Sequence, residues 1–431
     1  MSITRPLGFL AAATTAGIKP SGKPDVALIV RELTDDSGDT ARQGTAMAFT
    51  RNQLIGAPLV IARDLRSRTL RGELAPPSVV LINAGNSNAA TGQQGVADAY
   101  RTCEVAAKLL ARPANHVIPS STGVIGRMLP VQKIVDALPS LVSTLARGDE
   151  ADAAAARAIM TTDNVPKVAH RELTIDAFNV RLGAIAKGAG MIAPRLDSAS
   201  RAEAPSATML VFITTDAAID SPTLQVALDN ASDHSFNRIT VDNHASCSDT
   251  VIAMSSGLAP DLTDTRGAMP SIRPNTPAFD AFSAALSGLC ADLSHQIVRD
   301  GEGATRTFTV IVNGAPTNDD ADRIAREVVN SPLVKCAVHG KDPNWGRVVT
   351  AAGNAGVPFD ASRASLTIGD VEVFASGRPI PEALDVPALK VAVAADDVRF
   401  TLSLNNGPGR GWMTGCDLTT EYVRINADYT T

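Results

Sequence analysis

A short apolar run near the middle of the chain constrains the fold more than any other stretch. At Thr208 the sequence changes from small and polar residues to the five consecutive apolar residues 209–213. Such a run is typical of a strand that is buried on both faces. It therefore predicts a strand inside a covered sheet, with a single hydroxyl group at its start.

Helical and strand patterns are mixed along the rest of the chain, which favours an α/β or α+β fold. The predicted helices are 97–111, 151–160 and 279–297. The predicted strands are 78–83, 307–312 and 398–404. Asn318 is expected to cap a helix that runs to Val329. Two stretches, 194–207 and 258–277, have the composition of exposed loops.

Composition excludes several classes of function. The 431 residues carry a net charge of −6 and show no basic cluster typical of nucleic-acid binding. No apolar run reaches the length of a membrane span, and the start of the chain lacks the pattern of a secretory signal. A cytoplasmic protein is therefore expected. The five cysteines and six histidines show no spacing typical of a disulfide framework or a metal site, so buried, reduced thiols are expected.

Thr208 could carry chemistry if the peptide bond before it were broken. A threonine hydroxyl needs a base before it can attack a carbonyl group. The freed α-amino group, with an ordinary pKa of about 7.7–8.0, could be that base. The alternative is that Thr208 only starts a strand, as β-branched residues often do, and composition alone favours this alternative.

Seven sequence motifs favour a catalytic role for Thr208 over the alternative that it only starts a strand. They are STGVIG (121–126), RAIMTTDNVPK (157–167), AKGAGMIAP (186–194), ATMLVFITTDA (207–217), DGEGATR (300–306), VNSPLVKCAVHGKDPNWGRV (329–348) and YVRINADYTT (422–431). Together they resemble the ornithine acetyltransferase family of arginine biosynthesis, also called glutamate N-acetyltransferase or ArgJ. The resemblance runs in order from about residue 17 to the last residue, and several motifs have ten or more residues.

The resemblance implies a self-cleaving acetyltransferase. Cleavage at the bond between Ala207 and Thr208 would give an α chain, 1–207, and a β chain, 208–431. Thr208 would take an acetyl group from N-acetylornithine and pass it to glutamate by ping-pong covalent catalysis. The implied fold is a DmpA/ArgJ-like layered αββα sandwich of the N-terminal-nucleophile type, with a smaller α/β subdomain at about 306–400.

The resemblance also implies which small molecules and chains take part. No cofactor or metal is implied, although some family members accept acetyl-CoA as a co-substrate. The substrates are N-acetylornithine and glutamate, with no nucleic acid and no membrane. The implied assembly is a heterotetramer of two α and two β chains.

Site residues are carried over from the family motifs. Thr122 and Gly123 would present two backbone N–H groups to an oxyanion from a glycine-containing turn. The residues implied to bind substrate are Thr162, Lys187, Thr208, Glu302, Asn426 and Thr431. Lys187 would meet a carboxylate and Glu302 the substrate ammonium group. Without the resemblance, Lys187 could equally be a solvated loop lysine, and Glu302 a loop carboxylate after a helix.

The motif HGKDPNWGR (339–347) is predicted to be structural rather than catalytic. Asp342 and Pro343 favour a turn. Trp345 is expected to anchor the loop, and Arg347 to pair with a carboxylate.

Two stretches depart from the family pattern. Residues 195–206 separate Pro194 from Ala207 and are roughly ten more than is typical, an insertion that a fold tolerates. Residues 244–247 read His-Ala-Ser-Cys, where relatives show Asp followed by Thr or Ser. The first change can impede self-cleavage and the second can alter substrate choice. Two alternatives therefore stay open: an aminopeptidase or amidase, and an uncleaved, catalytically silent relative that binds amino acids.

Overall fold

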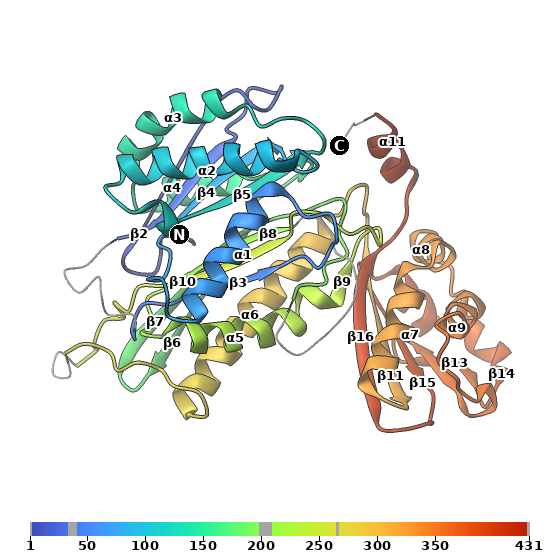
Figure 1. Ribbon diagram of the computed structural model, residues 1–431. Coiled ribbons are helices and arrows are strands. Elements are labelled where there is room, and N and C mark those ends of the chain that lie inside the picture. Colours follow the sequence, from blue (N-terminus) through green and yellow to red (C-terminus); the bar gives the residue numbers. More distant parts are fainter. Residues whose placement is uncertain (1, 33–40, 198–208, 264–266, 429–431) are drawn as a thin grey trace. The chain divides into compact units, whose positions relative to one another are not determined.

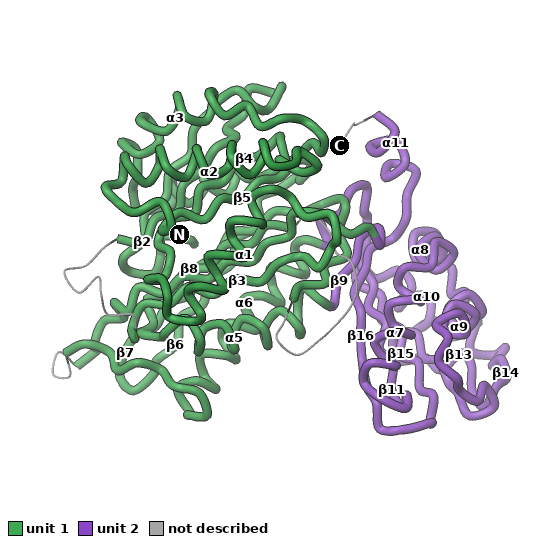
Figure 2. Tube along the Cα trace, viewed as in Figure 1, with its two compact units in different colours: residues 1–237, 244–297, 431 green, residues 238–243, 298–430 purple. Residues whose placement is uncertain are grey.

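The structure is a computed structural model, and it describes residues 2–32, 41–197, 209–263 and 267–428 (Figure 1). Helices and strands form a mixed α/β fold, which confirms the predicted class. The chain divides into two compact units (Figure 2). Unit 1 comprises Met1–Asn237, His244–Ile297 and Thr431, and unit 2 comprises Arg238–Asn243 and Val298–Thr430.

The first sheet of unit 1 has four strands in the order β1-β2-β4-β5. Their bounds are β1 Phe9–Thr14, β2 Val26–Arg31, β4 Val79–Asn86 and β5 Val117–Val124. One face packs against α2 (Gly92–Leu109) and α3 (Val131–Ser143) in a core that includes Leu28, Cys103 and Leu138. The strand predicted at 78–83 and the helix predicted at 97–111 are therefore confirmed as β4 and α2.

The second sheet of unit 1 has five strands in the order β3-β10-β8-β7-β6. Their bounds are β3 Thr45–Phe49, β6 Lys167–Ile175, β7 Phe178–Lys187, β8 Leu210–Thr215 and β10 Thr250–Ser255. Strand β8 is central: it pairs antiparallel with β7 and parallel with β10. All its residues are buried, which confirms the buried strand predicted from the run 209–213.

The two sheets of unit 1 face each other across a shared core. Phe9, Ile29 and Ile82 of the first sheet belong to the same apolar cluster as Phe212 and Ile252 of the second. Helices α1 (Ala57–Leu70) and α4 (Asp149–Ala158) add residues to this cluster. Figure 1 shows α2 and α3 outside the first sheet, and α5 (Ser221–Asp233) and α6 (Pro277–Arg299) outside the second. This arrangement confirms the expected layered αββα sandwich.

Unit 2 is built around a seven-stranded sheet in the order β14-β13-β12-β15-β11-β16-β9. The strands are β9 Ile239–Thr240, β11 Thr307–Ala315, β12 Ser365–Ile368, β13 Val371–Ala375, β14 Arg378–Pro379, β15 Asp397–Ser403 and β16 Gly409–Cys416. The helices are α7 Asn318–Asn330, α8 Pro332–His339, α9 Trp345–Gly353, α10 Pro387–Ala394 and α11 Thr420–Asp428. Helix α7 packs on β11 and β16. The smaller C-terminal α/β part expected from the sequence lies within this unit.

One predicted helix cap is wrong by a single position. The N-cap of α7 is Thr317, whose extended backbone lets its hydroxyl accept the N–H of Asp320. Asn318 is instead the first helical residue, and its side chain accepts the backbone N–H of Arg410 at 2.9 Å. Both residue types cap helices well, and the tertiary contact with Arg410 decides between them.

The predicted exposed loop 194–207 is wrong at its beginning. Leu196 is buried, and its N–H donates to Asn237 Oδ1 at 2.6 Å. The next residue, Asp197, forms a 2.6 Å ion pair with Arg66 of α1. The start of the insertion is therefore held to unit 1, and residues 198–207 lie outside the described part of the chain.

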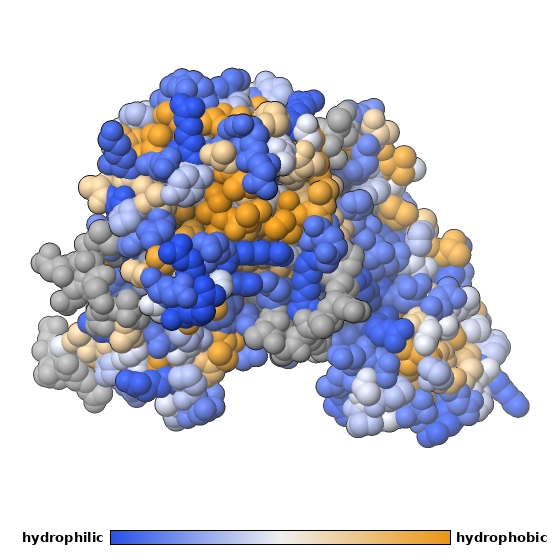
Figure 3. Space-filling view, in the orientation of Figure 1, coloured by the Kyte–Doolittle hydropathy of each residue, from blue (hydrophilic) through white to orange (hydrophobic). Residues whose placement is uncertain are grey.

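The state of the cysteines and the character of the surface largely agree with the expectations from composition. All five cysteines are free, as expected, although Cys336 is exposed rather than buried. Figure 3 shows a largely polar face with an apolar area around the position of α1, near which Leu54 and Val60 are exposed. Over the residues that the structure describes, no helix combines the length and the apolar character needed to span a membrane.

Candidate active site

The predicted site residues fall into one group in each unit. Thr122, Gly123, Thr162 and Lys187 belong to unit 1. Glu302 and Asn426 belong to unit 2. The predicted cleavage site, Ala207 and Thr208, and the last residue, Thr431, lie outside the described residues.

The backbone directly after Thr208 is held on both of its peptide groups. The N–H of Met209 donates to the carboxylate of Asp249, and the carbonyl of Met209 accepts the N–H of Thr250 at 2.9 Å. Met209 and Asp249 are both fully buried. Sequence reasoning did not identify Asp249, although its place directly before the apolar strand β10 was a signal. The backbone that follows position 208 is therefore held rigidly at Met209.

Lys187 reaches from one sheet of unit 1 to the other. It is the last residue of β7 and pairs with Leu210, two residues after Thr208. Its Nζ lies 3.3 Å from Oγ1 of Thr122 in β5, and both side chains are buried. The alternative of a solvated loop lysine is therefore wrong, because the strand carries the ammonium group into the interior.

Asp163 joins the segments that carry Thr162 and Lys187. Its Oδ1 accepts Nζ of Lys167 and the N–H of Gly188, both at 2.7 Å, and its Oδ2 accepts the N–H of Thr161 at 3.0 Å. Burial alone would raise the pKa of Asp163, but the ammonium groups of Lys187 and Lys167 lower it to about 2. Thr162 is half-buried beside this carboxylate. Asp163 is thus an ionised hub, although the sequence motif 157–167 that contains it did not mark it as a site residue.

Gly123 lies at the end of a strand rather than in the expected turn. It pairs with Gly85 of β4, where the register is irregular. Its φ is +128°, and a Cβ here would lie 2.4 Å from the carbonyl carbon of Gly85. Only glycine fits this conformation and this close approach of two strands.

Replacing Gly123 with alanine is expected to separate β4 from β5 and to lower the melting temperature markedly, by a loss of about 2 kcal/mol or more in stability. Gly126→Ala is the matched control, because Gly126 also has a positive φ, +77°, but no atom lies within 4 Å of a Cβ there. Thermal melting followed by circular dichroism measures both. Equal shifts in the two variants would contradict the steric argument.

In unit 2, Glu302 is buried in the loop after α6 and accepts Nδ2 of Asn426 at 2.8 Å. Asn426 lies on α11, so the chain is helical up to Asp428. Gly303 has a φ of +69°, and a Cβ there would lie 2.4 Å from the backbone nitrogen of Tyr422. The loop and the helix therefore pack closely and bring together two of the predicted substrate contacts.

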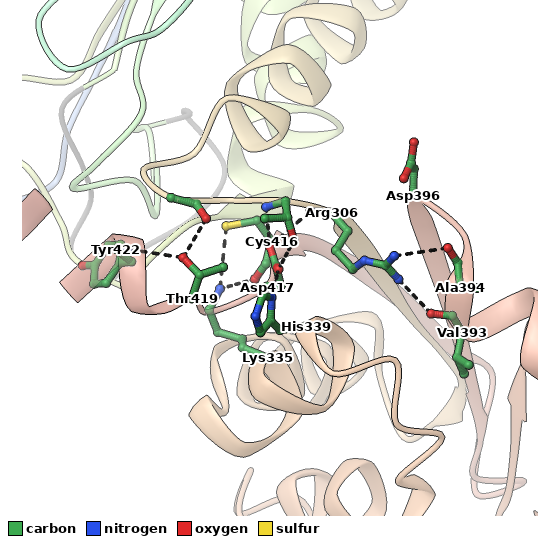
Figure 4. A network of polar contacts seen from close by, with 12 residues as sticks. Arg306, Lys335, His339, Val393, Ala394, Asp396, Cys416, Asp417, Thr419 and Tyr422 are labelled. Atoms are coloured by element: carbon green, nitrogen blue, oxygen red, sulfur yellow. Dashed lines mark hydrogen bonds and ion pairs between the residues drawn. The ribbon is translucent and has the colours of Figure 1, made fainter. Parts of the chain in front are cut away.

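A polar network in unit 2 fixes the same loop (Figure 4). The carboxylate of Asp417 accepts the N–H of Thr305 at 2.8 Å and contacts Nδ1 of His339 at 2.9 Å. Burial would raise the pKa of Asp417, but these hydrogen bonds lower it. Buried Lys335 donates to the carbonyls of Val241 and Cys416. The contact of His339 gives the start of the motif 339–347 a structural explanation.

The rest of that motif agrees in part with its prediction. Trp345 stacks on Phe374 with ring centroids 5.3 Å apart. Arg347 does not pair with a carboxylate as predicted: its Nη1 donates to the carbonyl of Leu333 at 2.9 Å.

The second departure from the family pattern, 244–247, leads directly towards Asp249. Ser246 and Cys247 are buried, and the carbonyl of Cys247 accepts the N–H of Gly56 at 2.8 Å. Burial raises the pKa of the Cys247 thiol. An inert, packed thiol is the physical consequence.

Comparison with known proteins identifies the family to which the chain belongs. The model of the ArgJ family matches residues 10–431. The chain belongs to the ArgJ family. This confirms the predicted resemblance and the predicted class of enzyme, an acetyltransferase. The family match covers both units, including every residue of the two groups.

Two relatives that the chain covers almost completely agree with this assignment. The arginine biosynthesis bifunctional protein ArgJ of Symbiobacterium thermophilum is 40% identical over 431 residues, covering 100% of this chain and 98% of its own. The protein of the same name from Thermosynechococcus vestitus is 39% identical, with the same two coverages. A solved structure of ornithine acetyltransferase complexed with ornithine, from Mycobacterium tuberculosis, is 35% identical and covers 46% of this chain and 96% of its own, with a TM-score of 0.39.

Proposed function

We propose that this ArgJ-family chain cleaves itself before Thr208 and then transfers an acetyl group from N-acetylornithine to glutamate. The observation that carries the proposal is the support of the backbone at Met209, next to the buried pair of Lys187 and Thr122. A nucleophile must be held rigidly to attack a bound carbonyl group. The central strand of a covered sheet provides that rigidity.

The proposed reaction has two half-reactions. The hydroxyl oxygen of Thr208 attacks the acetyl carbonyl carbon of N-acetylornithine, and its proton passes to the α-amino group of Thr208. The amide C–N bond breaks, ornithine leaves with that proton, and an acetyl ester remains on Thr208. The amino group of glutamate then attacks the ester, giving N-acetylglutamate and restoring the hydroxyl group.

The unit 1 residues have separate tasks in this scheme. The backbone N–H groups of Thr122 and Gly123 would stabilise the oxyanion of each tetrahedral intermediate. The ammonium group of Lys187 would bind a substrate carboxylate, and Thr162 would add a hydrogen bond. Asp163 would orient both segments through its bonds to Gly188 and Thr161.

Glu302→Gln is expected to raise the KM for N-acetylornithine by about tenfold or more, because Glu302 would lose its charge opposite the substrate's side-chain ammonium group. The KM for glutamate, which has no such group, should change much less. Steady-state kinetics with each substrate varied in turn measure both. Equal changes in KM for the two substrates would show that Glu302 does not bind the side-chain ammonium group of N-acetylornithine.

Several finer statements belong to the same proposal. The enzyme would work as a heterotetramer of two α and two β chains, in the cytoplasm, without a cofactor or metal. Acetyl-CoA is proposed as a second acetyl donor. The family resemblance supports each of these statements, and each is open to direct assay.

Intact mass under denaturing conditions tests the proposed function. We expect two pieces whose masses sum to the full chain plus one water, with the heavier starting at Thr208. N-acetylornithine should add one acetyl group to this piece, and glutamate should remove it. Acetate release without glutamate would favour the amidase alternative. A single intact 44.7 kDa chain would favour the silent relative.

A further inference from the structure

Lys19 is a second lysine close to the unit 1 group. Its side chain packs on Gly85: a Cβ there would lie 3.1 Å from Cγ of Lys19. Gly85 in turn pairs with Gly123. The ammonium group of Lys19 is near enough to Lys187 and Asp163 for their charges to act on it. Lys19 therefore lies beside the strands that carry the proposed oxyanion hole.

The ammonium group of Lys19 donates two hydrogen bonds within the protein and can donate a third. Its Nζ donates to the carbonyls of Pro24 and Ala158, both at 2.8 Å. An ammonium group has three N–H donors, and over the described residues the third has no partner. Lys19 is half-buried, so this donor is shielded in part from water.

Charges of both signs act on Lys19. The ammonium groups of Lys187 and Lys23 and the buried carboxylates of Asp25 and Asp163 all contribute to its electrostatic surroundings. Asp25 is already bonded to the backbone N–H groups of residues 16, 18 and 19. A carboxylate bound beside Lys19 and Lys187 would be attracted by both ammonium groups.

The protonation of Lys19 depends on its burial and on the same charges. Burial, opposed by Asp25 and Asp163 and assisted by Lys187 and Lys23, lowers the pKa of Lys19 to about 8. A further cation, Lys133 of α3, is exposed and donates to the carbonyl of Gly17. A bound carboxylate would favour the charged form of Lys19.

We propose that Lys19 and Lys187 together bind the α-carboxylate that N-acetylornithine and glutamate share. This inference rests on the proposed function, and it adds Lys19 to the site as a substrate-binding residue. The competing explanation is structural. Ala158 is the last residue of α4, and its carbonyl needs a donor that Lys19 supplies.

Two substitutions separate the charge of Lys19 from its packing. Lys19→Met keeps the unbranched stem on Gly85 but removes the ammonium group, while Lys19→Arg keeps the charge. We expect Lys19→Met to raise the KM for both substrates by about tenfold or more, with kcat within about threefold of wild type. Lys19→Arg should stay within about threefold in KM. Lys23→Met, on the same loop but exposed, is the matched control and should change neither constant appreciably.

The pH dependence gives a readout that a structural role would not move. The wild-type KM for both substrates should rise between pH 7.5 and pH 9.5, about the pKa of 8, because neutral Lys19 loses its attraction for the carboxylate. This rise should be absent in Lys19→Met. In Lys19→Arg it should disappear because the guanidinium stays charged.

Three results would overturn the inference: an unchanged KM in Lys19→Met, equal losses in the Met and Arg variants, or the same pH dependence in all three proteins. Failure of the proposed function would look different, because wild-type protein itself would not transfer acetyl groups. In that case, calorimetric titration of wild type and Lys19→Met with glutamate decides the matter. Weaker binding by the variant supports the carboxylate site, and equal or absent binding to both proteins contradicts it.

Discussion

Replacing Thr208 with alanine is expected to leave the chain uncleaved and to abolish acetyl transfer, with a loss of at least about 10³-fold in kcat/KM. Without a side-chain hydroxyl, neither the acyl shift at the Ala207–Thr208 bond nor the acetyl ester can form. The effect should be large because one atom serves both steps. Denaturing mass spectrometry and the transfer assay measure the two consequences separately.

Thr208→Ser is the matched control, because it keeps the hydroxyl group and removes only a methyl group. It should retain some cleavage and some transfer. The uncleaved forms of the two variants should have closely similar melting temperatures, since they differ in only one small side chain. Appreciable transfer by Thr208→Ala would rule out this residue as the nucleophile.

Replacing Asp163 with alanine is expected to lower the free energy of unfolding by about 3–5 kcal/mol at pH 7. The substitution leaves the buried ammonium groups of Lys167 and Lys187 without their shared counter-charge, and breaking a buried ion pair on one side carries such a cost. It also removes the acceptor for the N–H groups of Gly188 and Thr161. Urea unfolding measures the loss.

The acid stability of the wild-type protein should depend on the same carboxylate. Its pKa of about 2 in the folded protein lies below the ordinary value of 3.8, so the folded state binds fewer protons than the unfolded state. This stabilisation is fully present above about pH 4 and is lost as the pH falls towards 2. Asp163→Asn should show a smaller loss of stability between pH 4 and pH 2.5 than wild type.

Asp280→Ala is a suitable control, because Asp280 is exposed in the first turn of α6. Its effect on unfolding should stay within about 0.5 kcal/mol. If Asp163→Ala were no more destabilising than this surface substitution, the hub assigned to Asp163 would be wrong.

The strands and helices that the sequence predicted well are those with strong local patterns. The apolar run 209–213 led to β8, and the spacing of apolar residues in 279–297 led to α6. The boundaries and caps of the helices were predicted less accurately. Thr317 replaced Asn318 as the cap of α7 because both residues suit the position and a distant strand bonds Asn318.

The contacts within the candidate site were beyond the sequence for a different reason. Lys187 meets Thr122 only because β7 and β5 belong to two sheets that face each other, and 65 positions separate the two residues. Asp249 reaches Met209 from 40 positions away. No local pattern of residues encodes such meetings.

By itself the sequence determined the class of fold, the central strand and, through seven motifs, the family and its expected nucleophile. These follow from local periodicity and from long sequence motifs, which need no knowledge of distant neighbours. Only the tertiary structure decided that Lys187 is buried, that the ionised Asp163 joins the segments around it and that Lys19 lies close by. The reason is physical: burial and pKa depend on every group that packs around a residue, whatever its distance along the chain.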